Sequence, residues 1–351
     1  DDFLSDLEAY NNTHVTNTTS ADMAMYQYTS GTSRELPEAV KHRHRAVVTV
    51  MIAALYATGV RPGDKYMCPS SPAWGHGLWH GTLAPLALGI EISTYAGKFD
   101  PEKLLAAMEK FKITNLSAAA THYRLMRNIS HPKKHSLRLK KLSFTGEPLD
   151  TETAHWARQT FGHDVCSIYG STEVGVIIAN YPGADDLPVK VGSLGKPLPG
   201  CGVSIQNPQG KACSVGEIGE IVLWRKNNFF RVKDLGSIDE DGYYFHHGRA
   251  DDVIISAGWT MSAVEIEDVL LKHSDIAEAA VIGVPDTERG QVVKAFIVSK
   301  RSESIEFISE VQSFVRNRLS RHEYPRIIVI VDELPKTPAG KVNRKTLRDQ
   351  Q

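Results

Sequence analysis

Apolar runs and glycine-rich turns alternate along the first half of the chain. Residues 23–28 and 113–120 are short apolar runs with the length of buried strands. Residues 44–58 and 101–111 are rich in helix formers, and Gly59 ends the first of these two segments. Because strands alternate with helices, we expect a layered α/β domain whose strands pair in parallel.

The pattern changes in the second half of the chain. Short β-like runs separated by glycine and proline turns indicate a small antiparallel β subdomain at about residues 190–248. Beyond it, strand and helix patterns alternate over a short length, which is typical of a compact α+β unit. We therefore expect a large mixed-sheet domain at residues 1–248 and a C-terminal domain at 249–351, joined at 249–252.

Two loops that follow predicted strands have the composition of ligand sites. The first surrounds a glycine with hydroxyl side chains and consists of Thr29, Ser30, Gly31, Thr32 and Ser33. Main-chain N–H groups and hydroxyls in such a loop can converge on a phosphate, although an isolated stretch of this kind is usually an ordinary polar turn. The second loop, residues 169–173, brings hydroxyls and a carboxylate to the end of another strand. Both loops lie where α/β sheets usually hold their ligands.

Composition and charge limit the classes of partner. The formal net charge of the 351 residues is -1, so no overall field attracts nucleic acid or an anionic membrane. The four cysteines form no CxxC pair and no compact spacing, which argues against a zinc site and a disulfide framework. No apolar run approaches the ~18 residues of a membrane span, and the first residues lack the features of a signal peptide. We expect a cytoplasmic protein with a small-molecule partner.

Six segments taken together resemble the adenylate-forming superfamily, in particular the AMP-forming acyl-CoA synthetases. In chain order they are residues 28–37, 146–148, 169–173, Asp234 with 239–243, 248–252 and 335–344. Each segment alone is weak, but six in this order are hard to obtain by chance. The resemblance implies a layered α/β large domain and a C-terminal lid domain. It also implies an ATP-dependent carboxylic acid:CoA ligase that works through an acyl adenylate and forms acyl-CoA, AMP and pyrophosphate.

The resemblance implies roles for individual residues. Residues 29–33 would hold the β- and γ-phosphates of ATP. Thr172 would bond the α-phosphate, and Glu173 would hold Mg²⁺, since a carboxylate oxygen suits a hard cation. The adenine would be framed by Gly146, Glu147, Pro148, Tyr169 and Gly170, with the ring of Tyr169 offering a stacking face. Asp234 would accept hydrogen bonds from the ribose hydroxyls, and Arg249 would support the ribose or a phosphate.

Lys341 is the residue that the resemblance implies for the adenylation step. An ammonium is a compact charge on a flexible stem, so it can stabilise the charge that develops between the acid and the α-phosphate. The C-terminal domain would then rotate about a hinge at Asp251 and present the loop around Gly258 to coenzyme A.

The acid itself is indicated by only a few positions. Trp74 lies in an aromatic, glycine-rich segment for which core packing and pocket lining are equally good interpretations. Gly170 stands where acetate-specific members of the family have a bulky tryptophan, which favours a medium-chain or aryl acid over acetate. Trp74, Trp79 and His80 are alternatives for refilling that space.

Departures from the family pattern leave alternatives open. The phosphate loop has one extra residue and places Glu38 where a lysine usually falls. Members of the family also have a long segment before this loop that is missing here, so we expect a fragment, or a homo-oligomer or partner chain that covers the gap. The alternatives to a CoA ligase are an adenylating domain that loads a carrier-protein thiol and a non-catalytic adenylate-binding homologue.

Overall fold

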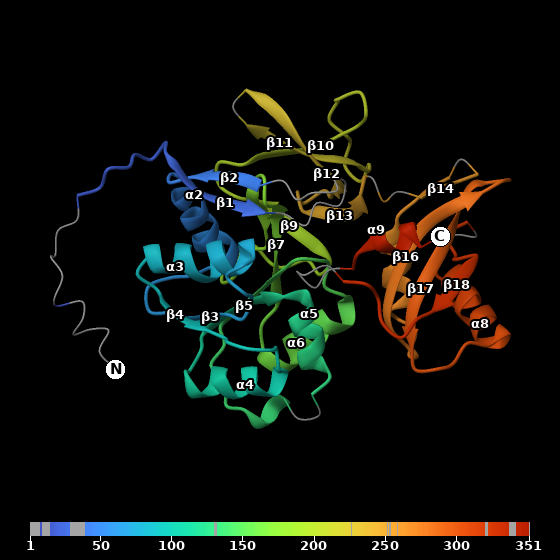
Figure 1. The fold of residues 1–351 in the computed structure, drawn as a ribbon, viewed down its shortest axis with the longest axis horizontal. Coiled ribbons are helices and arrows are strands. Elements are labelled where there is room, and N and C mark those ends of the chain that lie inside the picture. The colour runs from blue at the N-terminus through green and yellow to red at the C-terminus, as the bar shows by residue number, and fades with distance from the viewer. Residues whose placement is uncertain are drawn as a thin grey trace.

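A large domain and a smaller C-terminal domain make up the fold (Figure 1). The computed structural model describes residues 8, 15–28, 39–129, 132–225, 227–250, 252, 254–257, 259–319, 322–336 and 342–350. The predicted α/β architecture, with a mixed sheet in the large domain and a compact α+β C-terminal domain, is confirmed.

In the part of the chain that the structure describes, the large domain is built on one 11-stranded sheet. Its strands are, in hydrogen-bonded order, β10 (Gly202–Gln206), β11 (Gly219–Arg225), β12 (Asn228–Ile238), β13 (Tyr244–Arg249), β9 (Ser193–Pro197), β8 (Gly175–Ala179), β7 (Val165–Ser171), β6 (Lys141–Thr145), β5 (Asn115–Ala119), β3 (Lys65–Cys68) and β4 (Glu91–Thr94). Pairing is parallel from β4 to β7 and antiparallel from β7 to β10. The antiparallel strands expected after residue 190 therefore continue the parallel half of the same sheet.

Helices cover both faces of this sheet (Figure 1). One face carries α4 (Pro101–Lys110), α5 (Ala120–Arg127) and α6 (Thr151–Phe161), and a short 3-10 helix, η3 (Pro132–Lys134), lies after α5. The other face carries α2 (Ala46–Ala53), the π-helices η1 (Ala54–Thr58) and η2 (His76–Leu83), and α3 (Ala84–Ala87). Because side chains alternate along a strand, Met67 of β3 joins the first core, whereas Tyr66 and Cys68 join the second.

The starts of α4 and α6 are fixed by aspartate caps. Asp100 accepts a hydrogen bond from the N–H of Lys103, and Asp150 accepts one from the N–H of Thr153. Asp150 thereby begins α6 two residues after the turn at residues 146–148, to which the family resemblance gives a role in binding adenine.

Two glycines bring η2 close to the end of β3. A Cβ at Gly77 would lie 2.2 Å from the carbonyl oxygen of Ser71, and a Cβ at Gly81 would lie 2.9 Å from Sγ of Cys68. Trp79 is buried between them, and its Nε1 donates a 3.0 Å hydrogen bond to Oε1 of Gln27. Of the two interpretations of the aromatic segment, core packing holds for Trp79.

The first described strand lies outside the main sheet. Among the described residues, β1 (Met23–Tyr28) pairs with β2 (Ala39–Arg43) alone, in a two-stranded sheet. Met23 and Tyr26 are exposed. The prediction of a strand is confirmed, but the prediction that it is buried is wrong, because no described layer covers those side chains.

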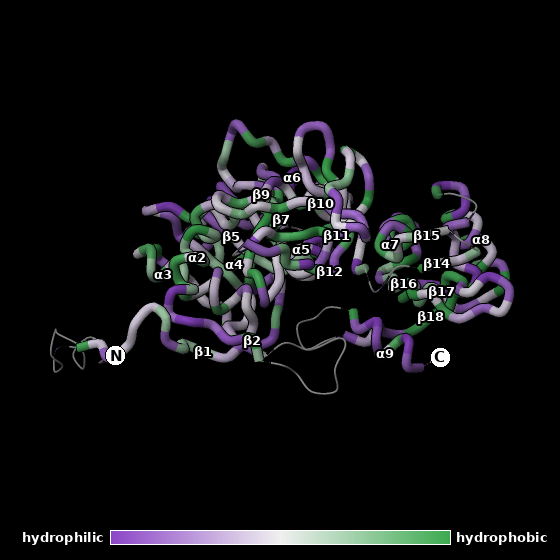
Figure 2. The backbone as a smooth tube through the Cα atoms, turned by 90° about the horizontal axis from the view of Figure 1, so that it is seen from above, coloured by the Kyte–Doolittle hydropathy of each residue, from purple (hydrophilic) through white to green (hydrophobic). Residues whose placement is uncertain are grey.

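The helix α2 exposes apolar side chains although its sequence is apolar on every side, as the green tube in Figure 2 shows. Val48 is 57% exposed, and Ile52, Tyr56, Leu83 and Leu86 continue this exposed surface over η1, η2 and α3. A helix that is apolar all round is ordinarily buried on all sides. We call these five side chains the α2 patch.

The C-terminal domain packs helices on a three-stranded sheet, at the right of Figure 1. Its elements are β14 (Ile254–Ser256), β15 (Trp259–Met261), α7 (Ala263–Leu270), β16 (Ile276–Asp286), β17 (Gly290–Ser299), α8 (Ile305–Arg316), β18 (Ile327–Ile330) and α9 (Arg344–Asp349). Ile266, Val281 and Phe307 are fully buried in its core. Within the described ranges, no helix is both long and apolar enough to cross a bilayer.

Candidate nucleotide site

The carboxyl ends of β6 and β7 bring two of the predicted segments side by side. β6 runs into the turn at residues 146–148, in which Gly146 takes a φ of +106° that glycine adopts readily. β7 ends at Ser171, so Tyr169 and Gly170 lie in the strand, and of the predicted loop at residues 169–173 only Thr172 and Glu173 lie in the turn that follows it. Because β6 and β7 are hydrogen-bonded neighbours, the turn and the loop share one edge of the sheet, where α/β folds hold ligands.

Asp234 is held between two partners near this edge. The hydroxyl of Tyr169 donates a 2.6 Å hydrogen bond to Oδ2 of Asp234, and Nη1 of Arg249 lies 3.2 Å from Oδ1. Arg249 is also the strand partner of Asp234, across β12 and β13. The structure therefore brings together three residues that are 65 and 15 positions apart in the sequence.

Tyr169 is buried as well as hydrogen bonded. Its ring is 9% exposed, and burial together with the nearby carboxylate of Asp234 raises the pKa of its hydroxyl well above the ordinary value. The hydroxyl therefore stays protonated and can donate to Asp234. Little of the ring is open to solvent, so the stacking of Tyr169 on adenine stays a prediction.

The packing of β7 against β8 explains why residue 170 is a glycine. A Cβ at this position would lie 1.9 Å from the carbonyl oxygen of Gly175 and 2.8 Å from Cα of Val176. The close approach of β7 to β8 therefore requires a glycine here. This contact explains the residue without reference to an acyl pocket, so Gly170 alone is a weak argument for a large acid.

Thr172 and Glu173 follow β7, and Glu173 is exposed. Among the described residues, no group of three or more histidines, cysteines or carboxylates could hold a metal. One exposed carboxylate nevertheless fits Mg²⁺, which commonly binds through one or two carboxylates and the phosphate oxygens of its substrate. Glu173 is thus suited to an ion that arrives with a nucleotide.

Arg124 of α5 bonds to the turn at residues 146–148 and to the cap of α6. The sequence analysis did not identify this residue. Its Nη1 pairs with the carboxylate of Glu147, its Nη2 donates a 2.7 Å hydrogen bond to the carbonyl of Pro148, and its Nε lies 3.1 Å from Oδ2 of Asp150. Burial tends to lower the pKa of Arg124, but the carboxylates of Glu147 and Asp150 outweigh burial and raise it.

Three histidines of η2 and α5 lie near the ends of β3 and β5, and the sequence analysis named only His80 among them; His80 is buried, and His76 and His122 are partly buried. The two ring nitrogens of His76 hydrogen bond with Oγ of Ser70 and Oγ of Ser117, each at 2.9 Å. Burial lowers the pKa of His76 to about 3 and the pKa values of His80 and His122 to about 4. All three rings are therefore neutral at pH 7. The spacing of four residues between His76 and His80, which places both on one side of a helix, is the signal that could have revealed His76. Trp74, just before η2, is partly buried.

Several predicted site residues lie outside the described residues. They are Thr29, Ser30, Gly31, Thr32, Ser33, Asp251, Gly258 and Lys341. Their roles, the hinge and the domain boundary at 248/249 stay predictions.

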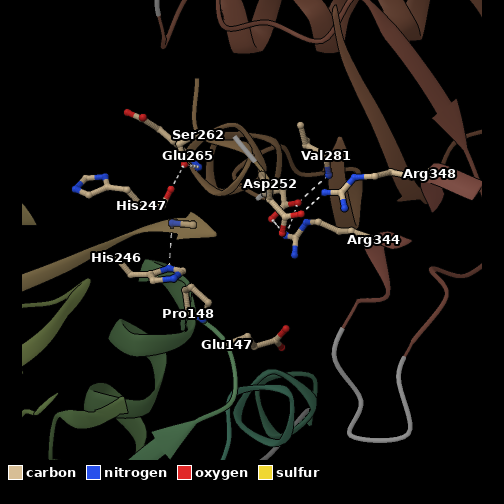
Figure 3. A network of polar contacts seen from close by, with 12 residues as sticks. Glu147, Pro148, His246, His247, Asp252, Ser262, Glu265, Val281, Arg344 and Arg348 are labelled. Atoms are coloured by element: carbon tan, nitrogen blue, oxygen red, sulfur yellow. Dashed lines mark hydrogen bonds and ion pairs between the residues drawn. The ribbon is translucent and has the colours of Figure 1, made fainter. Parts of the chain in front are cut away.

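The C-terminal domain faces the turn at residues 146–148 (Figure 3). Nη2 of Arg344 in α9 donates to both carboxylate oxygens of the buried Glu267 of α7, at 2.7 and 2.6 Å, and Arg348 pairs with Asp252. Burial tends to lower the pKa of Arg344, but the carboxylates of Glu267, Asp252 and Glu147 outweigh it and raise the pKa. Glu147 therefore lies within electrostatic reach of both domains.

Two family models match the chain. The model for the AMP-binding enzyme matches residues 2–231, and the model for the AMP-binding enzyme C-terminal domain matches residues 265–341. Together they cover the sheet edge that carries Tyr169 and most of the C-terminal domain.

Relatives and solved structures agree with these matches. An uncharacterized acyl–CoA ligase of Bacillus subtilis, YtcI, is 34% identical over 95% of this chain and 67% of its own length. The 4-hydroxybutyrate–CoA ligase 1 of Metallosphaera sedula is 32% identical over 97% of this chain and 64% of its own. The crystal structure of the anthranilate CoA ligase AuaEII with anthranoyl-AMP has a TM-score of 0.86 and 26% identity, covering 97% of this chain and 68% of that one. This chain thus spans about two thirds of the length of these proteins. It belongs to the AMP-binding enzyme family of adenylate-forming proteins.

Proposed function

We propose that this chain performs the nucleotide chemistry of an ATP-dependent carboxylic acid:CoA ligase. The acid attacks the α-phosphorus of ATP, pyrophosphate leaves, and the acyl adenylate passes its acyl group to the thiol of coenzyme A. The observation that carries the proposal is the contact of Asp234 with Tyr169 and Arg249 beside the turn at residues 146–148. The relatives named as CoA ligases support the same reaction.

Asp234 suits the ribose because its carboxylate is an acceptor that Tyr169 and Arg249 hold in place before a nucleotide binds. A carboxylate has two oxygens and about four lone-pair sites, so each oxygen keeps a site for a ribose hydroxyl after bonding with Tyr169 or Arg249. Its side chain is only 13% exposed, which limits competition from water. An ordered acceptor needs little further ordering when the nucleotide binds.

The phosphates would follow from the ribose toward Thr172 and Glu173. The hydroxyl of Thr172 would donate to the α-phosphate, and residues 29–33 would hold the β- and γ-phosphates. Mg²⁺ held by Glu173 would neutralise phosphate charge. Lys341 would stabilise the charge that develops between the acid and the α-phosphorus, which is electrostatic stabilisation of the transition state.

We further propose that the two domains have different roles in the reaction. Their boundary lies at residues 248/249, with a hinge at Asp251. The ion pair of Asp252 with Arg348 of α9 supports a hinge that precedes residue 252. Rotation about the hinge would exchange Lys341 for the loop around Gly258, which would meet coenzyme A.

For the acid, we propose a medium-chain or aryl carboxylic acid rather than acetate. The support comes from matched proteins named as 4-hydroxybutyrate, anthranilate and benzoate ligases, although an acetyl-coenzyme A synthetase also matches, at 31% identity.

ATP–pyrophosphate exchange with acetate, hexanoate, benzoate and anthranilate tests the proposal, with coenzyme A consumption measured in parallel. We expect exchange with hexanoate or an aryl acid, together with thioester formation. Exchange without coenzyme A consumption would instead favour a carrier-protein acceptor. Binding of AMP without exchange by any acid would favour a non-catalytic adenylate-binding protein.

A further inference from the structure

We propose that Arg124 is a positioning residue that fixes the turn at residues 146–148 and thereby gives the site its preference for adenine. The inference rests on the proposed function, because it takes this turn to be the base-binding element. Arg124 touches the turn, not the nucleotide, so its effect on the base is indirect.

The guanidinium of Arg124 is used by three partners at once. Nη1 pairs with the carboxylate of Glu147, Nη2 bonds the carbonyl of Pro148, and Nε bonds the Asp150 carboxylate that caps α6. A planar guanidinium presents donors in fixed directions, whereas a lysine ammonium is a point charge on a flexible stem. One side chain therefore ties the turn to two helices, α5 and α6.

The position of Arg124 is itself set by the sheet. α5 begins at Ala120, directly after β5, and β5 pairs with β6, which delivers the turn. The turn is thus held from both sides: by its own strand, and by a helix that follows the neighbouring strand. This frame determines where the main chain of the turn lies relative to the strand ends.

The fixed position of the turn also determines which of its main-chain carbonyl groups can accept a hydrogen bond from a bound base. Arg124 occupies the carbonyl of Pro148 and the carboxylate of Glu147, but not the carbonyls of Gly146 and Glu147. A main-chain carbonyl accepts a hydrogen bond from the exocyclic amino group of adenine and repels the O6 of hypoxanthine, which is itself an acceptor. A turn held in one position therefore discriminates between adenine and hypoxanthine better than a turn that shifts.

We expect the turn at residues 146–148 to shift when Arg124 is removed, because the carboxylate of Glu147 is also attracted to the C-terminal domain. This carboxylate lies within electrostatic reach of Arg344 of the C-terminal domain, and Figure 3 shows Glu147 and Pro148 facing that domain. Arg124 draws Glu147 toward the large domain. Without Arg124, Arg344 still attracts this carboxylate toward the C-terminal domain.

Arg127 provides a matched control. It lies one turn further along α5, its side chain is 35% exposed against 32% for Arg124, and it also pairs with Asp150, at 3.3 Å. Its other partners are Glu152 and Thr153 in α6, not the turn. Arg127→Gln therefore removes a comparable charge from the same helix and leaves both contacts of Arg124 with the turn.

The test is calorimetric binding of AMP and IMP to the wild type, Arg124→Gln, Arg124→Lys and Arg127→Gln, with thermal unfolding to verify that each variant is folded. We expect Arg124→Gln to weaken AMP binding by about tenfold and to reduce the ratio of AMP to IMP affinity. Arg124→Lys should restore little of either, and Arg127→Gln should stay within about twofold of the wild type. In exchange assays, the KM for ATP should rise while kcat changes little.

The possible failures are distinguishable. If the wild type binds neither AMP nor ATP, the proposed function fails, and this inference fails with it. If the wild type binds AMP and the two glutamine variants behave alike, Arg124 is an ordinary structural arginine and the inference alone is overturned. An equal loss of AMP and IMP affinity in Arg124→Gln would likewise overturn the role in base preference.

Discussion

Acidification from pH 6.5 to 4.5 should destabilise this fold through His76, His80 and His122. Burial lowers the pKa values of these side chains from 6.5 to about 3, 4 and 4 in the folded chain. Within this range the unfolded chain binds protons that the folded chain does not, so the free energy of unfolding falls as the pH falls. Above about pH 7.5 the rings are neutral in both states, and their contribution is constant.

The magnitude follows from the distance between the pH and the ordinary pKa. At pH 4.5 the histidines of the unfolded chain are almost fully protonated and those of the folded chain are mostly neutral, which corresponds to about 2 kcal/mol for each side chain relative to pH 6.5. The three side chains together reduce the free energy of unfolding by about 6 kcal/mol, compared with a typical total of about 5–15 kcal/mol. Burial also raises the pKa of Asp268 to about 6, which acts in the opposite direction, so we expect a smaller net loss of stability than the histidines alone would cause.

Urea unfolding followed by tryptophan fluorescence at a series of pH values measures this dependence. His80→Asn removes one of the three groups and should reduce the slope of unfolding free energy against pH by about a third. His155 is exposed, and His155→Asn should leave the slope unchanged. A free energy that stays constant between pH 6.5 and 4.5, or equal slopes in the two variants, would refute the reasoning.

Three further predictions concern the site. Asp234→Asn should raise the KM for ATP by about tenfold, because the ribose loses a charged acceptor, and exchange kinetics would contradict this if only kcat changed. Gly170→Ala should destabilise the fold by about 1–3 kcal/mol or more in thermal unfolding, since its Cβ would lie 1.9 Å from the carbonyl oxygen of Gly175. A stable variant with an altered range of acids would instead support a place in the acyl pocket. Lys341→Ala should abolish ATP–pyrophosphate exchange and spare thioester formation from supplied acyl adenylate, and equal loss of both reactions would count against its role.

The sequence predicted the helices and strands of the fold better than it predicted which layers cover them and how the strands pair. The strand at residues 23–28 could be predicted from its apolar run, but its exposure could not, because exposure depends on which distant layers cover it. The change from parallel to antiparallel pairing was visible in the turn spacing. That both halves form a single sheet depends on the pairing of β7 with β8, which short-range patterns do not encode.

The candidate site was predictable where its residues follow strand ends. Gly146 and Glu173 follow β6 and β7, and the resemblance to a known family added Asp234 and Arg249. Arg124 was not predictable, because its partners lie 23 to 26 residues further along the chain and meet it only through the packing of α5 on α6.

The α2 patch has a practical consequence for work on this chain. Val48, Ile52 and Tyr56 recur every four residues, so they form one stripe, and the neighbouring α3 extends it. Water in contact with such a stripe is released when two stripes meet, which contributes about 25 cal/mol for each Å² of apolar surface covered. Copies of the chain should therefore adhere reversibly as concentration rises. Every affinity and rate described above is best measured over a dilution series, with light scattering to record the particle size at each concentration.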